Sequence, residues 1–334
     1  MPLDYVVKRF GLLLVTVILG VTINFMLPRM MPGDPVEQKL NQLYATSGGQ
    51  MPDLTAMIES YRARFGLDQP LWNQYLNYWW SLAHFDLGYS LDRFPEKVSD
   101  TIGSALPWTL GLVGTSTLIS FTIGTLLGGL LGWPRVPRPV RGLIPLLMIL
   151  SAIPYFLLGL VLVFVFAIVL KLFPAGGGYP FGSALRYDVS TIVAILQHAF
   201  LPATSIILAG IGSWALAMRG MIISILGEDY IVLAEAKGLK QRRIFVWYAM
   251  RNALLPQITT LGLAMSHVVA GAILVEVIFA YPGIGYKLFQ AIGAKDYFVI
   301  QGIVLMMIVA IAVILFILDL IYPLIDPRIA YERR

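Results

Sequence analysis

The chain has 334 residues, of which 58% are hydrophobic and only 13% are charged, and it contains no cysteine. Soluble domains are about one quarter charged, so this composition excludes an ordinary soluble protein and indicates an integral membrane protein. The absence of cysteine excludes disulfides, thiolate nucleophiles and iron–sulfur ligation.

Six apolar runs without a charged residue each reach the roughly 18 residues that a membrane-spanning helix needs. They occupy 10–28, 101–134, 142–170, 189–218, 252–275 and 297–318. We therefore expect an all-α integral membrane protein with six transmembrane helices. The first run follows Lys8 and Arg9 and has no small-residue cleavage pattern after it, so we interpret it as an uncleaved anchor.

Lysine and arginine are distributed unevenly between the connections, which predicts the orientation. With a cytoplasmic N-terminus, the inner side collects the basic residues of 135–141 and 237–251, whereas few lie in the short outer connections. Both termini are then cytoplasmic. We expect residues 1–31 to hold the N-terminus and first span, and 32–100 an extracytoplasmic helical segment. The transmembrane core follows at 101–325, with a cytoplasmic loop at 219–251 and a tail at 326–334.

The outer segment is too long for a simple turn and is expected to have its own structure. Residues 54–65 predict a helix that ends at Gly66, and Pro70 begins a second helix rich in tryptophan and tyrosine. These aromatic residues are enriched at membrane interfaces. We interpret the pair as amphipathic helices on the headgroups, with a partner-docking surface as the alternative.

The inner segment 228–256 is basic and amphipathic and lies between two predicted spans. Glu228 and Asp229 suit a helix N-terminus, and Gly238 permits a sharp turn before a second short helix. In that helix Ile244, Trp247 and Tyr248 are predicted to share one face, because their spacing is i, i+3, i+4. Such a helix-turn-helix is suited to act as a lever for a soluble partner.

Within the membrane, Gly124, Gly128 and Gly132 recur at the spacing that lets helix backbones approach closely. Glu276 lies near the outer end of the fifth predicted span, where a carboxyl group is costly unless it is paired or faces water. We treat it as a candidate gate or pathway residue, with pairing to a neighbouring helix or snorkelling as the alternative. His267 is a weaker gate candidate, and Asp319 is expected to be structural.

Several motifs of known chemistry are absent from the sequence. It contains no phosphate-binding loop G-x-x-x-x-G-K-[ST], no H-E-x-x-H and no G-x-S-x-G. We therefore predict no catalytic residue, no metal site and no bound cofactor, and we expect any energy from ATP to be supplied by another protein. From these residues alone, two other functions also stay open: an ion-coupled secondary transporter and an intramembrane enzyme.

Separate stretches of the chain resemble one family. They are AEAKGLKQRRIFVWYAMRNALLP at 234–256, PGDP at 32–35, RFGLDQPLWNQYLNYWWSLAHFDLGYSL at 64–91, VEVIFAYPGIGYKLFQAI at 275–292, DYFVIQGIV at 296–304 and IDPRI at 325–329. In this order they are similar to the permease subunits of ATP-binding-cassette importers, in the dipeptide and oligopeptide branch. The first stretch resembles the loop that couples such permeases to their ATPases.

The resemblance implies a set of partners and a cellular site. The partners are a second homologous permease subunit, two cytoplasmic ATPase subunits that bind ATP and Mg, and an extracytoplasmic solute-binding protein. The site is the cytoplasmic (inner) membrane of a bacterium or archaeon. Peptides are the expected solute, with oligosaccharides, opines or nickel chelates as alternatives within the family. The expected ATPase-docking residues are Tyr230, Leu233, Ala234, Glu235, Ala236, Lys237, Gly238 and Leu239.

Overall fold

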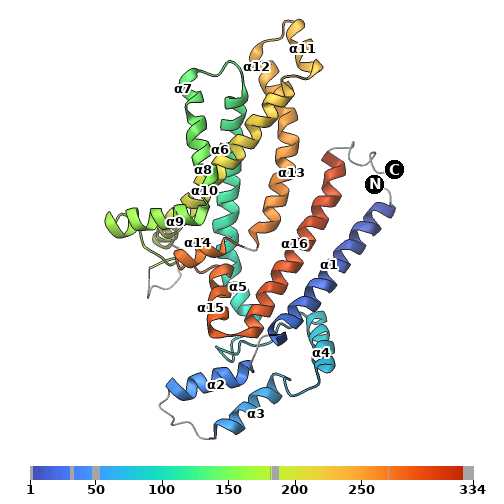
Figure 1. Cartoon of the computed structure of the whole chain (residues 1–334), viewed down its shortest axis with the longest axis vertical. Coiled ribbons are helices and arrows are strands. Elements are labelled where there is room, and N and C mark those ends of the chain that lie inside the picture. The colour runs from blue at the N-terminus through green and yellow to red at the C-terminus, as the bar shows by residue number, and fades with distance from the viewer. Residues whose placement is uncertain are drawn as a thin grey trace.

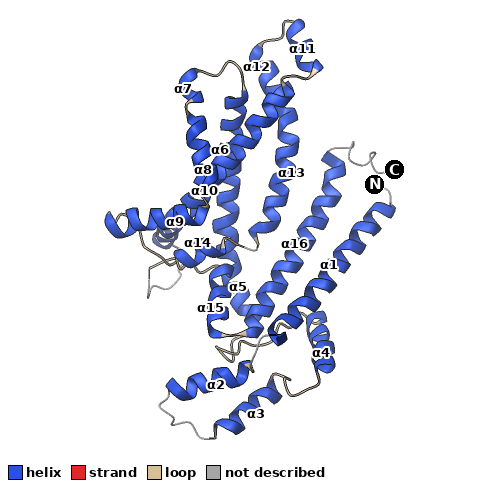
Figure 2. Cartoon of the chain, viewed as in Figure 1, coloured by secondary structure: helices blue, strands red, loops and turns tan. Residues whose placement is uncertain are grey.

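The structure is a computed structural model that describes residues 3–30, 34–46, 53–180, 182, 188–269 and 271–325. Throughout these residues the regular elements are helices, with no strand among them (Figure 2). This confirms the all-α prediction. The bilayer, which acts as the solvent for these segments, explains why they are helical. Backbone groups in a bilayer have no water to bond with, so each span satisfies its own N–H and C=O groups as a helix.

Four helical stretches in the described residues are long and apolar enough to cross a membrane. They are α1 (Leu3–Met30), the continuous stretch of α5 (Val98–Thr109), a π-helical turn (Leu110–Gly114) and α6 (Thr115–Gly132), then α10 (Val189–Ile225) and α16 (Tyr297–Ile325). A fifth candidate is a bent pair of helices. The third and fifth predicted runs, 142–170 and 252–275, differ from a single straight span.

The predicted span 142–170 is broken. It consists of α8 (Leu143–Ala152), α9 (Tyr155–Leu162) and a π-helical end (Val163–Val169), preceded by the short α7 (Arg138–Arg141). The two halves meet at an angle of 96°. Pro154 explains the break, because proline excludes the helical conformation for the preceding residue, and Ile153 is extended with ψ 121°.

The predicted span 252–275 is shorter than expected. Its helix, α13 (Arg251–Val268), ends seven residues before Val275 and is not among the candidate spans. Gly271 then adopts φ +76°, and a separate short helix, α14 (Ile273–Ile278), begins two residues later. A left-handed glycine cannot continue a right-handed helix, which accounts for the interruption. The predicted span 189–218 lies inside the longer α10.

The outer segment folds as three helices, α2 (Pro35–Thr46), α3 (Leu54–Arg64) and α4 (Leu71–Ala83). The predicted boundaries at Gly66 and Pro70 are confirmed, since Gly66 has φ +65° and Pro70 caps α4. Arg62 joins α3 to α2 through an ion pair with Asp34 at 2.6 Å. On α4, Trp72 and Trp80 are exposed, as an amphipathic interfacial helix requires.

Two further helices complete the fold, α11 (Asp229–Ala236) and α15 (Ile284–Ala294), with the short α12 (Gln241–Arg243) after α11. Figure 1 shows α7, α11 and α12 at one end of the molecule and α2, α3 and α4 at the other. The start of α1 and the end of α16 point toward the end that holds α11. This arrangement separates the basic loop from the outer segment.

Close packing of α6 on α10 confirms the predicted role of the spaced glycines. A Cβ on Gly128 would lie 2.1 Å from the backbone oxygen of Ala215, and one on Gly124 would lie 2.6 Å from Cβ of Trp214. One on Gly132 would lie 2.7 Å from Cβ of Ile222. The two backbones therefore approach closely along three successive turns, which ties α6 to α10.

Candidate functional site

The predicted inner segment 228–256, called the inner loop below, contains a helix-turn-helix whose turn is built by Gly238. Gly238 has φ +70°, its N–H donates to the carbonyl of Glu235 at 2.9 Å, and the N–H of Leu239 donates to that of Ala234 at 3.2 Å. This pair of bonds is the Schellman motif, which places a left-handed residue directly after the helix cap. Glycine takes that conformation without a steric penalty, so the sequence prediction of a sharp turn here is confirmed.

One face of α11 is buried against the chain itself. Ile231 and Ala234 are each 3% exposed. Their cluster contains Met218 and Ile222 of α10 together with Ile244, Ala249, Met250 and Ala253 from the following helices. Burying an isoleucine side chain stabilises a fold by about 1.5–3 kcal/mol, so α11 is held firmly on the inner end of α10. The cluster thus ties the loop to α10 and to the helices that follow the turn.

The opposite face of α11 is exposed. Tyr230, Leu233, Glu235, Ala236, Lys237 and Gly238 lie on it or on the turn, and Leu239 is partly buried. Ala234 differs from the prediction, because its methyl group packs inward and offers no surface to a partner. Val232, which the sequence analysis missed, is 58% exposed beside Leu233. The i, i+3 spacing of Ile231 and Ala234 is the signal that assigns the inner face and leaves Val232 outside.

The helix after the turn keeps only part of the predicted face, because Ile244 and Tyr248 pack on one cluster and Trp247 does not. Ile244 is fully buried, but Trp247 is 63% exposed. The segment 244–250 is π-helical, and Ile244 and Ala249 are both buried. Because a π-helix bonds i to i+5, its turn is wider than that of an α-helix, so the residues four and five after Ile244 stay near its face and Trp247, three after it, turns outward. Arg242 and Arg243 are exposed.

A polar contact bridges the turn of the loop, and burial favours the neutral form of Tyr230 on α11. Gln241 donates to the carboxylate of Glu235 at 3.3 Å, which bridges the turn. Burial raises the pKa of the Tyr230 hydroxyl, the charge of Glu228 raises it further, and Asn252 acts in the opposite direction. Tyr230 therefore presents a neutral, half-apolar surface at physiological pH.

Glu276 is a buried cap for the helix α15 and does not face an open path. Its side chain is 0% exposed. Oε2 accepts the N–H groups of Gly285 at 2.7 Å and Tyr286 at 3.2 Å. Oε1 accepts the Thr109 hydroxyl at 2.8 Å, and Thr109 in turn accepts the N–H of Ile284 at 2.8 Å. Three N–H groups that a helix start leaves unbonded are thus satisfied.

The glycines around Glu276 leave room for its carboxyl group. A Cβ on Gly283 would lie 2.4 Å from Cδ of Glu276. A Cβ on Gly271 would lie 3.1 Å from its Oε1. The stretch around Tyr281 to Tyr286 is therefore shaped around one carboxyl group, and this "outer clamp" (Glu276, Thr109 and the start of α15) joins α5 to α14 and α15. The geometry agrees with the alternative of pairing to a neighbouring helix.

The other candidate residues lie elsewhere. His267 is exposed on α13, so the structure does not bring it together with the buried Glu276. Asp319 pairs with Arg9 at 2.9 Å and joins α16 to α1, as its structural interpretation expected. Within the described ranges, no three His, Asp or Glu side chains converge as metal ligands.

These features first define a class: a multi-pass membrane protein with an exposed, internally braced helix-turn-helix at one end. The comparison with protein families then identifies the family. Residues 124–331 match the binding-protein-dependent transport system inner membrane component, and the chain belongs to this family. It is a permease of the ATP-binding-cassette importer type, a transport subunit whose family implies an ATPase and a substrate-binding protein as partners.

Relatives match the chain over its full length. It is 34% identical to the di/tripeptide transport system permease protein DppB of Pseudomonas aeruginosa, over 99% of this chain and 100% of the relative. It is 31% identical to the dipeptide transport system permease protein DppB of Escherichia coli K12, with the same coverage. A putative peptide transport system permease protein of Brucella abortus is 30% identical over 98% of this chain and 99% of its own length.

Proposed function

We propose that this chain forms half of a translocation pathway that carries di- or oligopeptides inward across the cytoplasmic membrane. A second homologous permease subunit forms the other half, two ATPase subunits dock on the inner loops, and a solute-binding protein delivers the peptide outside. The chain itself binds no cofactor, because the ATPase subunits hold ATP and Mg. The full-length similarity to peptide permeases of several bacteria supports peptide as the solute.

The observation that carries the proposal is the two-faced helix α11. On its buried face, Ile231 and Ala234 share a cluster with residues of α10 and α13. Its exposed face presents Tyr230, Val232 and Leu233 to a partner. A small apolar face with charged residues at its edge suits insertion into a groove. When the ATPases close on ATP, the loop is displaced and carries α10 and α13 with it. The pathway then switches between inward-facing and outward-facing states.

We propose that α13 and α14 together make the fifth of six membrane crossings, although this crossing is interrupted at Gly271. Six crossings place both ends of the chain in the cytoplasm, on the side of α11. The positive residues of the inner connections support this orientation. A reporter that is active only in the cytoplasm is expected to be active when it is fused after α16. A reporter that is active only outside the cytoplasm is expected to be inactive at the same position.

The test is ATP-dependent uptake by the reconstituted complex. Liposomes receive this chain, its partner permease and the ATPase subunits, and the binding protein and a labelled dipeptide or tripeptide are added outside. We expect uptake only with ATP inside and with the binding protein present. Uptake driven by an ion gradient in liposomes that contain this chain without ATPases would contradict the proposal. Uptake of an oligosaccharide or nickel chelate in place of peptides would contradict the assigned solute alone.

A further inference from the structure

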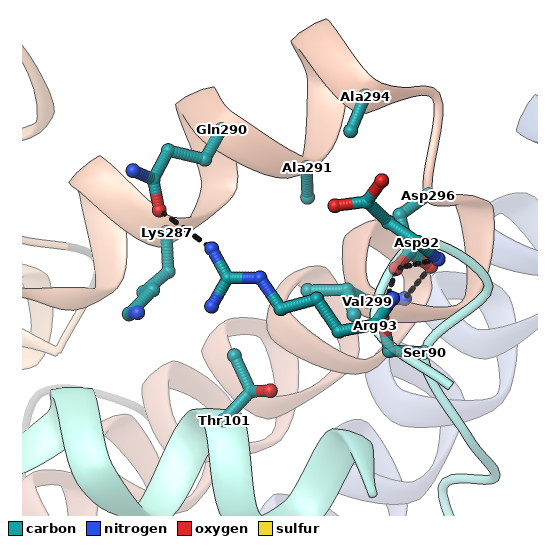
Figure 3. A pocket seen from close by; sticks show the side chains of 10 residues that line it. All are labelled: Ser90, Asp92, Arg93, Thr101, Lys287, Gln290, Ala291, Ala294, Asp296 and Val299. Atoms are coloured by element: carbon teal, nitrogen blue, oxygen red, sulfur yellow. Dashed lines mark hydrogen bonds between the residues drawn. The ribbon is translucent and has the colours of Figure 1, made fainter. Parts of the chain in front are cut away.

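A small cavity at the outer end of the molecule holds two cationic side chains close together. It is lined by the loop 90–93 and by α15, and its volume is about 30 Å³. Figure 3 shows the guanidinium of Arg93 and the ammonium of Lys287 at one end of this cavity, beside Gln290. Arg93 donates to the Gln290 side chain at 3.4 Å. We call this end, made by Arg93, Lys287 and Gln290, the outer notch.

Neither cation of the outer notch has a carboxylate partner in the described parts of the chain, since neither forms an ion pair there. The nearby acids are engaged elsewhere. Asp92 pairs with Lys39. Asp296 accepts from the Ser90 hydroxyl at 2.5 Å and from the N–H of Asp92 at 3.1 Å, at the other end of the cavity (Figure 3).

The fold holds these two like charges together at an electrostatic cost. Burial lowers the pKa of Lys287 and the neighbouring charge of Arg93 lowers it further, while Glu96 raises it. Glu96 itself accepts a hydrogen bond from the Thr101 hydroxyl at 2.8 Å. An added carboxylate between Arg93 and Lys287 reverses this cost, because it is attracted by both cations at short range.

The size and place of the outer notch select the kind of anion. One water needs about 10–15 Å³ of such volume, so the cavity admits the tip of one side chain and excludes a peptide. The notch lies on α15, at the end of the molecule away from α11 (Figure 1). Arg93 is exposed at its rim, so a protein that approaches from outside reaches it.

We propose that the outer notch receives one aspartate or glutamate side chain of the extracytoplasmic solute-binding protein when that protein docks. The proposal rests on the proposed function, because it needs a binding-protein partner. Arg93 and Gln290 set the position of the carboxylate, and Lys287 supplies the second charge from deeper in the cavity. The contact fixes the register of the docked protein and contributes to its encounter rate through attraction of opposite charges.

The test measures binding of the purified solute-binding protein to the complete importer in lipid nanodiscs. The double variant Arg93→Gln/Lys287→Gln is expected to raise the dissociation constant about tenfold or more at low salt. The matched control Lys97→Gln/Lys171→Gln removes the same charge from two exposed outer side chains that do not line the cavity, and we expect a change below about twofold. Arg93→Glu is then combined with single acid-to-lysine variants of the binding protein, and one of them is expected to restore binding.

Three results overturn the proposal. They are equal weakening by the notch and control variants, failure of every acid-to-lysine variant to restore binding, and unchanged binding with a raised KM for the solute. The last result assigns the notch to a carboxylate of the solute. ATP-dependent uptake by the wild-type complex is measured on the same preparation. If that uptake is intact, a negative result refutes the notch alone, whereas its absence refutes the proposed function.

Discussion

Gly238 offers a test in which the effect on folding is separated from the effect on docking. Its φ of +70° costs a residue with a Cβ about 1–2 kcal/mol. No atom lies within 4 Å of the position where that Cβ would stand. Alanine and tryptophan at this position therefore carry the same backbone penalty, and the Cβ atom of either one meets no clash inside the chain. They differ in the bulk that they place on the outer surface of the turn.

We expect Gly238→Ala and Gly238→Trp to lower the unfolding free energy of the subunit equally, by about 1–2 kcal/mol, because both leave the Schellman turn in place. Uptake and solute-stimulated ATP hydrolysis by the reconstituted complex are expected to persist in Gly238→Ala and to fall at least about tenfold in Gly238→Trp, the loss of about 1.4 kcal/mol in docking. Gly238→Asn is expected to be closest to wild type, since asparagine tolerates the left-handed conformation. If the tryptophan variant keeps full coupling, the turn does not contact the ATPase. If the alanine variant loses coupling as well, the effect comes from the backbone.

Three further substitutions test the packing on which the mechanism depends. Glu276→Ala leaves three buried donors without an acceptor, and we expect it to cost about 3 kcal/mol or more in thermal unfolding, whereas Glu59→Ala on an exposed surface changes little. Gly128→Ala puts a Cβ 2.1 Å from a backbone oxygen and is expected to reduce the folded yield in detergent, while Gly220→Ala, with nothing within 4 Å, is not. Ile231→Ala removes a side chain that is 3% exposed, costs about 2–5 kcal/mol and is expected to loosen the loop, seen as faster amide exchange in α11 than in α10. If Glu276→Ala or Gly128→Ala behaves like its control, the packing role assigned to that residue is contradicted. If amide exchange in α11 is unchanged in Ile231→Ala, the role of Ile231 in holding the loop is contradicted.

The sequence predicts most of the membrane helices because length and apolar composition are local properties. The runs that correspond to α1, α6, α10 and α16 could be assigned as helices without knowing which segments they pack against. The bend at Pro154 and the interruption at Gly271 were not predicted, although both residues are visible in the sequence. Proline and glycine occur in many unbroken transmembrane helices, where surrounding groups satisfy the backbone, so only tertiary context decides which of them interrupts a span.

The sequence predicts one part of the candidate site, the turn at Gly238, better than the other, the surroundings of Glu276. The turn at Gly238 follows from a helix, a glycine and a second helix, all within one short segment. Glu276 is marked by its cost in an apolar run, but its partner Thr109 is 167 residues away and carries no signal of its own. The choice between a gate residue and a paired carboxyl group therefore depended on the fold. Local rules failed even within the loop where the helix became π-helical.

One helix connects the inner loop to the outer clamp. Met218 and Ile222, near the inner end of α10, belong to the cluster that holds α11. Leu201, earlier in the same helix, belongs to the cluster that contains Val275 and Phe279 of the Glu276 region. A packed core repacks between discrete arrangements and does not deform continuously, so a displacement of α11 reaches α14 through α10 as a movement of whole helices. Because the outer clamp bonds α14 and α15 to α5, that movement also carries the helix with which the core begins. In the proposed function, this continuity is the physical route by which an ATPase docked on α11 acts on the opposite face of the membrane.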